Sequence, residues 1–145
     1  MQRVDKASVT IDGHVTGSIS CGLLVLLGIG KADTEAEAEF LAHKLVNLRI
    51  FNDSEGKMNL SLADICGQML IISQFTLYAS TRKGNRPSFT DAMPPHEAEQ
   101  LYLHFIQAVE KLQVHTERGI FGAHMQIELC NNGPVSIMVY SRNEG

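Results

Sequence analysis

The 145-residue sequence has no apolar run near the roughly 18 residues that a membrane-spanning helix needs. Its opening residues, 1–6, also lack the pattern of a secretory signal. Cysteine is scarce, with an odd number and no close pair: Cys21, Cys66 and Cys130. We therefore expect a cytoplasmic protein without membrane association, in which each cysteine is a small core residue kept reduced.

The usual marks of metal and nucleophile chemistry are missing as well. The six histidines include no pair at helical metal-ligand spacing and no cysteine partner nearby: His14, His43, His96, His104, His115 and His124. The chain has no Gly-rich phosphate loop and no Gly-x-Ser-x-Gly elbow. We expect no metal and no cofactor, so an enzyme built on this chain must use backbone groups, hydroxyls or the substrate itself.

Composition indicates one ordinary globular domain spanning residues 1–145. Hydrophobic residues make up 44% and charged residues 19% of the chain. A chain of this length buries roughly 68–70% of its unfolded surface. The net charge of −4 argues against broad electrostatic coating of nucleic acid but leaves room for a local basic site.

Hydrophobic periodicity predicts an α+β fold with two main helices. The first begins at the capping pattern Thr34-x-x-Glu37 and continues to the region of Arg49. The second begins at Pro94-Pro95 and carries one broad apolar stripe, which we interpret as core. Asp12-Gly13 closes a tight hairpin. Strands are predicted at residues 4–11, 14–19, 23–27, 58–62, 69–79, 125–129 and 135–139.

Residues 69–79 form the stretch around which the chain is built. The first half is apolar at every position, which is typical of a central strand covered on both faces. Period-two alternation places Gln74 and Thr76 on one face, and on the other Ser73, Phe75 and Leu77. A buried hydroxyl or amide without a partner costs roughly 1–3 kcal/mol, so these groups need internal hydrogen bonds or a ligand. A merely polar strand end and a binding strand end both fit the pattern.

A basic cluster follows that stretch, on a segment that its composition predicts to be a loop. Arg82, Lys83 and Arg86 lie within five residues of one another. On charge alone, a solvated loop is the simpler interpretation. The alternative is a phosphate clamp that positions nucleic acid beside the end of the strand without reading its sequence.

Residues 131–134, Asn-Asn-Gly-Pro, separate the last two alternating runs, so a plain hairpin turn is one interpretation. The proline after Gly133 removes a backbone N–H and makes a cis bond accessible. A cis peptide there would turn the two flanking carbonyls in nearly the same direction, giving a rigid pair of acceptors.

Taken together, these motifs resemble those of the D-aminoacyl-tRNA deacylases, the D-Tyr-tRNA(Tyr) deacylase type of bacteria and eukaryotes, over essentially the whole chain. Ser73-Gln-Phe-Thr76 and Gly133-Pro-Val135 in this order and near this separation are specific jointly, whereas either alone is weak. Ser136 stands where the family usually has threonine, which keeps the hydroxyl. Further matching residues are 2–4, 7–9, 22–28, 49–51, 56–59, 86–89 and 132.

The resemblance implies a compact, barrel-like α+β subunit that works as a homodimer. Gly133 and Pro134 of one subunit would enter the active site of the other, where they face the catalytic set Ser73, Gln74, Phe75 and Thr76. Arg3 matches the arginine that holds the Gly-Pro motif. The pocket for the terminal adenosine and the aminoacyl group would be lined by Phe89, Phe121, Ala123 and Met125.

The implied reaction is hydrolysis of D-aminoacyl-tRNA to a free D-amino acid and tRNA, a chiral proofreading step. Backbone N–H groups near Phe75 and Thr76 would stabilise the oxyanion, and the 2′-hydroxyl of the tRNA would help to activate water. Thr76 is expected to position the substrate, because no base is evident to activate its hydroxyl. Gly133-Pro134 would exclude L side chains, so glycine mischarged on tRNA(Ala) should also be accepted.

Two other functions fit parts of the pattern. One is the animal-type paralogue that removes a mischarged L-amino acid from tRNA, against which Arg3 beside Gln2 argues. The other is a non-catalytic dimeric module that captures the acceptor end of tRNA, and a turnover assay separates it from both enzymes.

Overall fold

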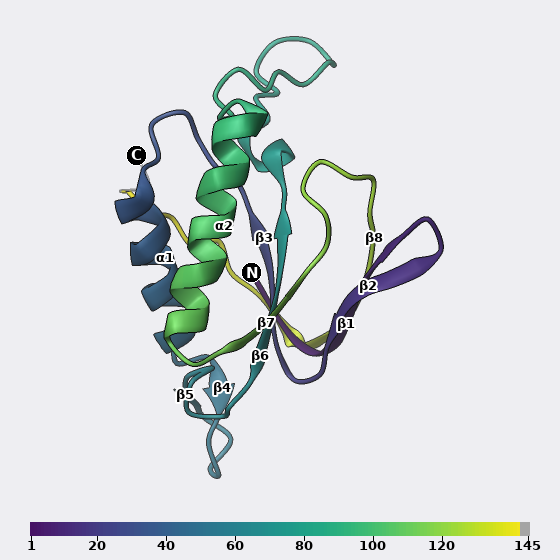
Figure 1. The fold of residues 1–145 in the computed structure, drawn as a ribbon. Helices are drawn as coiled ribbons and strands as arrows, with labels where there is room; N and C mark the ends of the chain where they lie inside the picture. The colour runs from purple at the N-terminus through teal and green to yellow at the C-terminus, as the bar shows by residue number, and fades with distance from the viewer. Residues whose placement is uncertain (143–145) are drawn as a thin grey trace.

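The computed structural model describes residues 1–142 and contains a six-stranded sheet (Figure 1). Its strands are β1 (Gln2–Ile11), β2 (His14–Ile19), β3 (Gly22–Leu27), β6 (Gln68–Ser73), β7 (His115–Arg118) and β8 (Gln126–Ser136). The order is β2-β1-β3-β6-β7, and β8 also pairs with β1. Ala7 pairs with both β2 and β8, so these two strands lie on opposite edges of β1.

The two ends of this strand order come close together. β3, β6 and β7 are parallel, whereas β2, β3 and β8 are antiparallel to β1. A Cβ atom built on Gly17 of β2 would lie 2.8 Å from the carbonyl oxygen of Arg118 at the end of β7. Only glycine tolerates so close a backbone approach. The sheet is therefore nearly closed and barrel-like.

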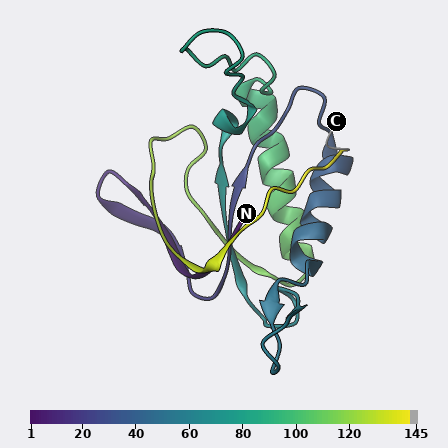
Figure 2. The ribbon, with the colours of Figure 1, turned by 180° about the vertical axis from the view of Figure 1, so that it is seen from behind.

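Helices α1 (Glu35–Asn47) and α2 (Pro95–Lys111) pack together against the sheet (Figures 1 and 2). The Glu37 carboxylate accepts the Thr34 N–H at 2.6 Å, as the capping pattern predicts. The Thr34 hydrogen bonds hold the pKa of Glu37 below its usual value. Pro95 occupies the first turn of α2, where its missing N–H costs nothing. Both predicted helices are confirmed.

The core consists of two clusters, one on each face of the central strands. Leu23, Val25 and Leu27 of β3 face the helices, while the intervening Leu24 faces the barrel interior. The same division applies to β6, whose alternate side chains join opposite clusters. The prediction that both strands are covered on both faces is confirmed. The fold is a single compact domain with two helices on a barrel-like sheet, as predicted.

The predicted strand 69–79 is too long. β6 ends at Ser73, and the chain continues as a short 3₁₀ helix, η1 (Phe75–Tyr78). The period-two assignment of Gln74 to Leu77 to opposite faces is therefore wrong. Strand pairing stops because β3 ends at Leu27, directly opposite Ser73, so no neighbouring strand extends further. A separate small hairpin is formed by β4 (Phe51–Asn52) and β5 (Met58–Leu60), which are joined by a polar turn at residues 53–57.

The two strands predicted near the C-terminus are one strand in the structure. β8 continues through residues 131–134 with a register shift and ends at Ser136, so residues 137–139 are not part of it. The preceding strand β7 was not predicted, because its sequence, His-Thr-Glu-Arg, has neither alternation nor an apolar run. It exists because it completes the free edge of β6.

The expectation that the cysteines are core residues is wrong, since all three are exposed. Cys66 lies in a turn, where its N–H donates to the Ala63 carbonyl and its φ angle is 52°. Cys130 lies on β8, which has a neighbouring strand only on the β1 side among the described residues. Within residues 1–142, no helix is long and apolar enough to cross a membrane.

Tyr102 links α2 to the sheet and provides a test of the fold. Its buried hydroxyl donates to the carbonyl oxygen of Ile71 in β6 at 2.7 Å. Tyr102→Phe should lower the free energy of unfolding by about 1–3 kcal/mol, because this carbonyl loses its side-chain partner. Urea denaturation at pH 7 measures the change, and Tyr140→Phe at an exposed position should have no effect.

The pH dependence of the stability of the wild type and of Tyr102→Phe provides a second test. Burial raises the pKa of Tyr102 from 10.0 to about 12. The unfolded chain therefore loses this proton first, so the contribution of the group to stability is complete below pH 10 and is lost towards pH 12. The stability difference between the wild type and Tyr102→Phe should narrow over this interval. A constant difference would contradict the assigned burial.

Candidate functional site

The predicted catalytic residues lie where β6 leaves the sheet. The N–H of Gln74 donates to the Leu27 carbonyl at 2.8 Å, which is the last backbone bond along the β3 side. The chain then turns into η1, which places Phe75 and Thr76 at the surface; the Phe75 side chain is 57% exposed. The expected continued burial of these polar groups is wrong, because Ser73 and Gln74 are only half-buried and Thr76 is exposed.

The first turn of η1 offers backbone donors. Its hydrogen bonds begin with Leu77, whose N–H donates to the Gln74 carbonyl at 3.2 Å. The N–H groups of Phe75 and Thr76 precede that bond and, like the first N–H groups of any helix, have no partner among the described residues. The side-chain amide of Gln74 donates to the Thr76 hydroxyl oxygen. One lone pair of that hydroxyl is thus occupied, and none of the described side chains accepts its proton.

The loop after η1 folds back onto η1. Phe89 packs edge-on against Phe75, with ring centroids 5.1 Å apart. A bridge between Ser80 and Ser88 closes the loop, because each N–H donates to the carbonyl of the other residue. The three basic side chains of the sequence analysis are all exposed on this closed loop: Arg82, Lys83 and Arg86. The prediction that this segment is a loop is confirmed.

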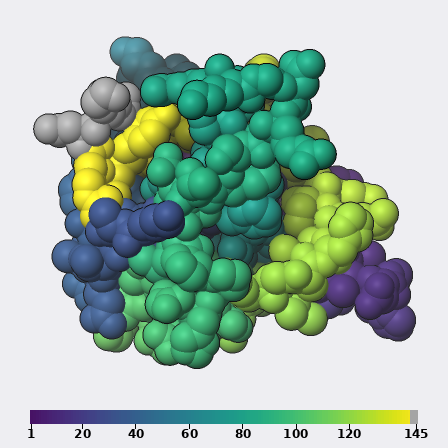
Figure 3. All heavy atoms as spheres, turned by 90° about the horizontal axis from the view of Figure 1, so that it is seen from above, coloured from purple at the N-terminus to yellow at the C-terminus, as the bar shows by residue number. Residues whose placement is uncertain are grey.

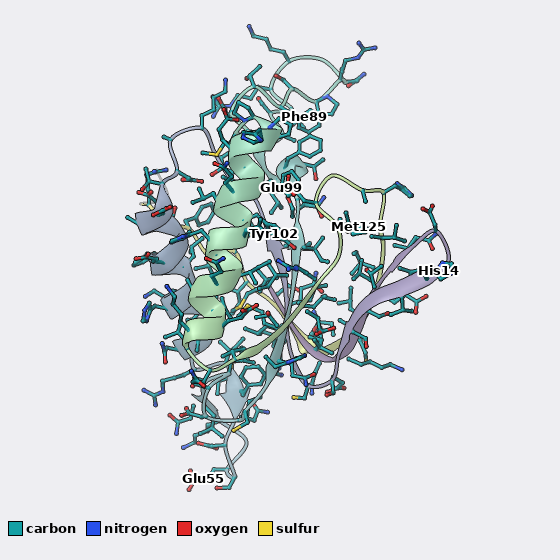
Figure 4. All side chains as sticks on the ribbon, in the orientation of Figure 1. His14, Glu55, Phe89, Glu99, Tyr102 and Met125 are labelled. Atoms are coloured by element: carbon teal, nitrogen blue, oxygen red, sulfur yellow. The ribbon has the colours of Figure 1, made fainter. Side chains whose placement is uncertain are left out.

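The segment between β7 and β8 carries the remaining predicted pocket residues, which are Phe121, Ala123 and Met125. Phe121 contacts Tyr102, with ring centroids 5.8 Å apart, and Tyr102 in turn binds β6 two residues before Ser73. Ala123 closes a turn by donating its N–H to the Ile120 carbonyl, and Met125 packs on the inner core cluster. Figure 4 shows that Phe89, Tyr102 and Met125 come from three different elements. From above, the segment after β7 and the η1 loop lie on one face (Figure 3).

Gly133 and Pro134 form the tip of a bulge in β8. Asn131 pairs with Val4 and Ser136 pairs with Gln2, so residues 132–135 stand opposite a single residue of β1. The two tip residues are exposed, the Gly133–Pro134 peptide bond is cis, and the φ angle of Gly133 is 142°. A Cβ on Gly133 would lie 2.7 Å from the Val135 side chain, so only glycine fits there.

Arg3 is the residue of β1 that faces this bulge. It is only 7% exposed, which is unusual for arginine and requires that its donors be paired. Its Nε donates to the Asn132 carbonyl at 2.9 Å, and one terminal nitrogen donates to the Ile50 carbonyl at 2.7 Å. Arg3 therefore connects one side of the bulge to the segment that precedes β4.

Within one chain, the bulge and η1 are far apart. Arg3 pairs with Leu23, and Leu23 pairs with Met69, which lies four residues before Ser73. At about 3.3 Å per residue, the bulge is thus displaced by about 13 Å along β6 from the candidate catalytic residues. The structure brings Ser73–Thr76 together with Phe89 but does not bring Gly133 and Pro134 to them.

Tyr78 fixes η1 in place, a role that the sequence analysis did not assign. Its ring lies against the segment after β3, where a Cβ on Gly30 would be 2.6 Å from the tyrosine oxygen. The same segment pairs with the residues that follow Phe89, since the Met93 N–H donates to the Ile29 carbonyl. The tyrosine hydroxyl is 3.5 Å from Asp33. Burial, and then the Asp33 charge, raise the pKa of Tyr78. No local sequence pattern identifies this contact, because only the fold brings Gly30 and Tyr78 together.

A cavity lies beside these groups. It measures about 410 Å³ and lies between α1, the end of β3 and the C-terminal segment 136–142. Leu77 and Tyr78 line it, but none of the predicted catalytic or pocket residues does. Arg142 closes one side through ion pairs with Asp33 at 2.6 Å and Glu37 at 3.1 Å. Residues 1–142 contain no cluster of side chains suited to hold a metal ion.

Comparison with known sequences gives consistent matches along the chain. A family model described as D-Tyr-tRNA(Tyr) deacylase matches residues 1–140. A protein of Fervidobacterium nodosum named D-aminoacyl-tRNA deacylase is 53% identical over 142 residues, which cover 98% of this chain and 95% of that protein. A protein of Roseiflexus castenholzii with the same name is 55% identical over 141 residues, covering 97% and 90% of the two chains.

Two solved structures have the same fold. One, named c-Myc DNA Unwinding Element Binding Protein, has a TM-score of 0.87 and 42% identity, and covers 94% of this chain and 93% of that one. The other is described as "Structural Analysis of a probable eukaryotic D-amino acid tRNA deacylase". It has a TM-score of 0.79 and 16% identity over 92% of both chains, so it supports the fold alone.

The contact between Gly30 and Tyr78 predicts a measurable coupling. Gly30→Ala should destabilise the protein by about 1–3 kcal/mol, because the added methyl group overlaps the tyrosine ring. In a Tyr78→Ala background the ring is gone, so the same glycine substitution should cost much less. Urea unfolding of the two single variants and the double variant measures the coupling. Equal costs in both backgrounds would show that Tyr78 does not occupy this space.

Proposed function

Because the chain belongs to the D-Tyr-tRNA(Tyr) deacylase family, we propose that it is a hydrolase that cleaves the ester bond of D-aminoacyl-tRNA. The products are a free D-amino acid and tRNA. The observation that carries this proposal is the match of residues 1–140 to the family, together with more than half identity to relatives named for the activity. We place the reaction in the cytoplasm, where charged tRNA is used.

The residues at the end of β6 suit a substrate that is already activated. Water attacks the ester carbonyl carbon, the bond from that carbon to the ribose oxygen breaks, and the ribose oxygen takes a proton. The N–H groups of Phe75 and Thr76, which precede the first hydrogen bond of η1, would bind the oxyanion that forms. The 2′-hydroxyl of the terminal ribose would help to orient and deprotonate the water, so the protein needs no strong base of its own.

Thr76 has a positioning role in this mechanism. Its hydroxyl oxygen accepts a hydrogen bond from the Gln74 amide, which withdraws electron density from the oxygen and lowers its nucleophilicity. Activation of a hydroxyl requires an adjacent base, and none of the described side chains supplies one. Gln74 and Thr76 together with Ser73 would therefore hold the ester against the backbone donors.

The proposed pocket for the terminal adenosine and the aminoacyl group extends from η1. Phe89 is held against Phe75, and Phe121 is held against α2 through Tyr102. Ala123 and Met125 lie on the same loop as Phe121, between β7 and β8. Aromatic faces and a methionine suit the stacking of a base, which needs no charge.

The chiral selector would come from a second copy of the chain. Gly133 and Pro134 are exposed at the tip of their bulge and distant from their own η1, so within one chain they have no substrate to contact. In a homodimer, the tip of one subunit would enter the site of the other. Its carbonyls would bind the amino group of the substrate and leave no room for an L side chain. Glycine, including glycine on tRNA(Ala), would pass.

Arg3 would support this selector by holding the base of the bulge. Its hydrogen bond to the Asn132 carbonyl fixes one side of the bulge, and its bond to Ile50 fixes the arginine itself.

The animal-type paralogue that acts on a mischarged L-amino acid remains the alternative enzyme, and a non-catalytic module that binds the acceptor end of tRNA is the alternative outside enzymes. A DNA-binding role, to which the name of one relative refers, has little support from a chain of net charge −4.

Side-by-side deacylation of D-Tyr-tRNA and L-Tyr-tRNA with catalytic amounts of protein tests the proposed function. We expect rapid loss of the D form and survival of the L form. Gly133→Ala should abolish activity or relax L rejection, because its Cβ would displace Val135 by overlap at 2.7 Å. Gly13→Ala, at the open turn between β1 and β2, is the matched control for a glycine with positive φ. Hydrolysis of the L form by the wild type indicates the paralogue, and no turnover indicates the binding module.

A second prediction concerns the loop of Arg82, Lys83 and Arg86. Replacing all three with alanine should weaken tRNA binding. It should also make the negative slope of log affinity against log salt shallower, by about two to three. Binding measured across a salt series gives that slope. The control removes three exposed lysines elsewhere: Lys6, Lys44 and Lys57. An unchanged slope in the loop variant would exclude this loop as the phosphate contact.

A further inference from the structure

Asn131 stands at the base of the bulge that carries Gly133 and Pro134, and its side chain closes that base. Its Oδ1 accepts the N–H of Val135 at 2.7 Å, and its Nδ2 lies 3.2 Å from the carbonyl oxygen of the same residue. One side-chain amide thus occupies both backbone groups of a residue four positions further along. It acts as the strand partner that the bulge removes.

Two more acceptors surround the same nitrogen. The Asn131 Nδ2 lies 3.2 Å from the Ser136 hydroxyl and 3.2 Å from the Gln2 side-chain oxygen. The Val135 N–H can only donate, so it fixes which end of the amide faces it and leaves Nδ2 towards the three acceptors. The Ser136 hydroxyl therefore accepts a hydrogen bond from the Asn131 amide.

Three contacts therefore anchor two residues of the bulge, Asn132 and Val135. Arg3 holds the Asn132 carbonyl, Asn131 holds the backbone of Val135, and the Val135 side chain packs against the main core cluster. Gly133 and Pro134 are the residues between these anchors. Arg3 fixes the side of the bulge that enters the tip, and Asn131 fixes the side that leaves it.

We propose that Asn131 is a positioning residue that sets chiral selectivity, by fixing the direction of the Gly133–Pro134 tip through the Val135 backbone. This inference rests on the proposed function. A sieve that works by exclusion depends on where its carbonyls stand, so a displacement of the tip relieves the overlap that would exclude an L side chain. Asn131 touches no substrate in this arrangement, so its effect must appear in discrimination before it appears in the D reaction.

Asn131→Asp is the sharpest test. It keeps the shape and the acceptor for the Val135 N–H, but it places a carboxylate oxygen against the Val135 carbonyl where the amide donated. We expect the rate ratio of L-Tyr-tRNA to D-Tyr-tRNA hydrolysis to rise by about tenfold, with the D rate changed by less than about threefold. Asn47→Asp, an exposed change of the same kind at the end of α1, should leave the ratio at the wild-type value.

Amide hydrogen exchange at Val135 gives a readout that does not depend on activity. The N–H should be protected in the wild type and in Asn131→Asp, and should lose protection in Asn131→Ala. The alanine variant also carries the selectivity test if the aspartate variant does not fold. An unchanged ratio of L to D rates, or an equal fall of both rates, would overturn the proposal. A wild type that does not hydrolyse D-Tyr-tRNA would overturn the proposed function itself.

Discussion

The parallel pairing of β3 with β6 is the constraint on which the rest of the molecule depends. Both strands are covered on both faces, by the helices on one side and by the barrel interior on the other. No substrate can reach the side chains along their length. Chemistry is therefore possible only at the ends of the pair, where the backbone leaves the sheet and polar groups can meet water.

The two ends of this pair are built differently. At the carboxyl end, the Gln74 N–H bonds Leu27 and the chain turns into η1, which exposes backbone donors. Towards the amino end, Arg3 and Asn131 hold a bulge of β8 with its tip in solvent. The length of the strands keeps these features apart in one subunit. In the proposed mechanism a second copy brings them together, so the length of β6 itself makes the site depend on assembly.

Sequence reasoning succeeded where a single local pattern decides the structure. The capping pattern at Thr34 and Glu37 and the apolar run of β3 predicted elements that the structure confirms. It failed where the neighbour decides: β6 stops at Ser73 because β3 stops, and β7 forms because β6 has a free edge. The contacts of Tyr78 and Asn131 join residues brought together only by the fold, so no spacing rule identifies them.

The candidate site is made largely from main-chain groups, and this explains which side chains carry weight. Backbone N–H groups of η1 would bind the oxyanion. Backbone carbonyls of Gly133 and Pro134 would distinguish D-aminoacyl from L-aminoacyl substrates. A main-chain atom cannot be replaced by mutation; it can only be moved. The side chains that matter are therefore those that fix the backbone: Tyr78 behind η1, and Arg3 and Asn131 at the base of the bulge. An activated ester tolerates such a site, because it needs accurate placement more than a strong nucleophile.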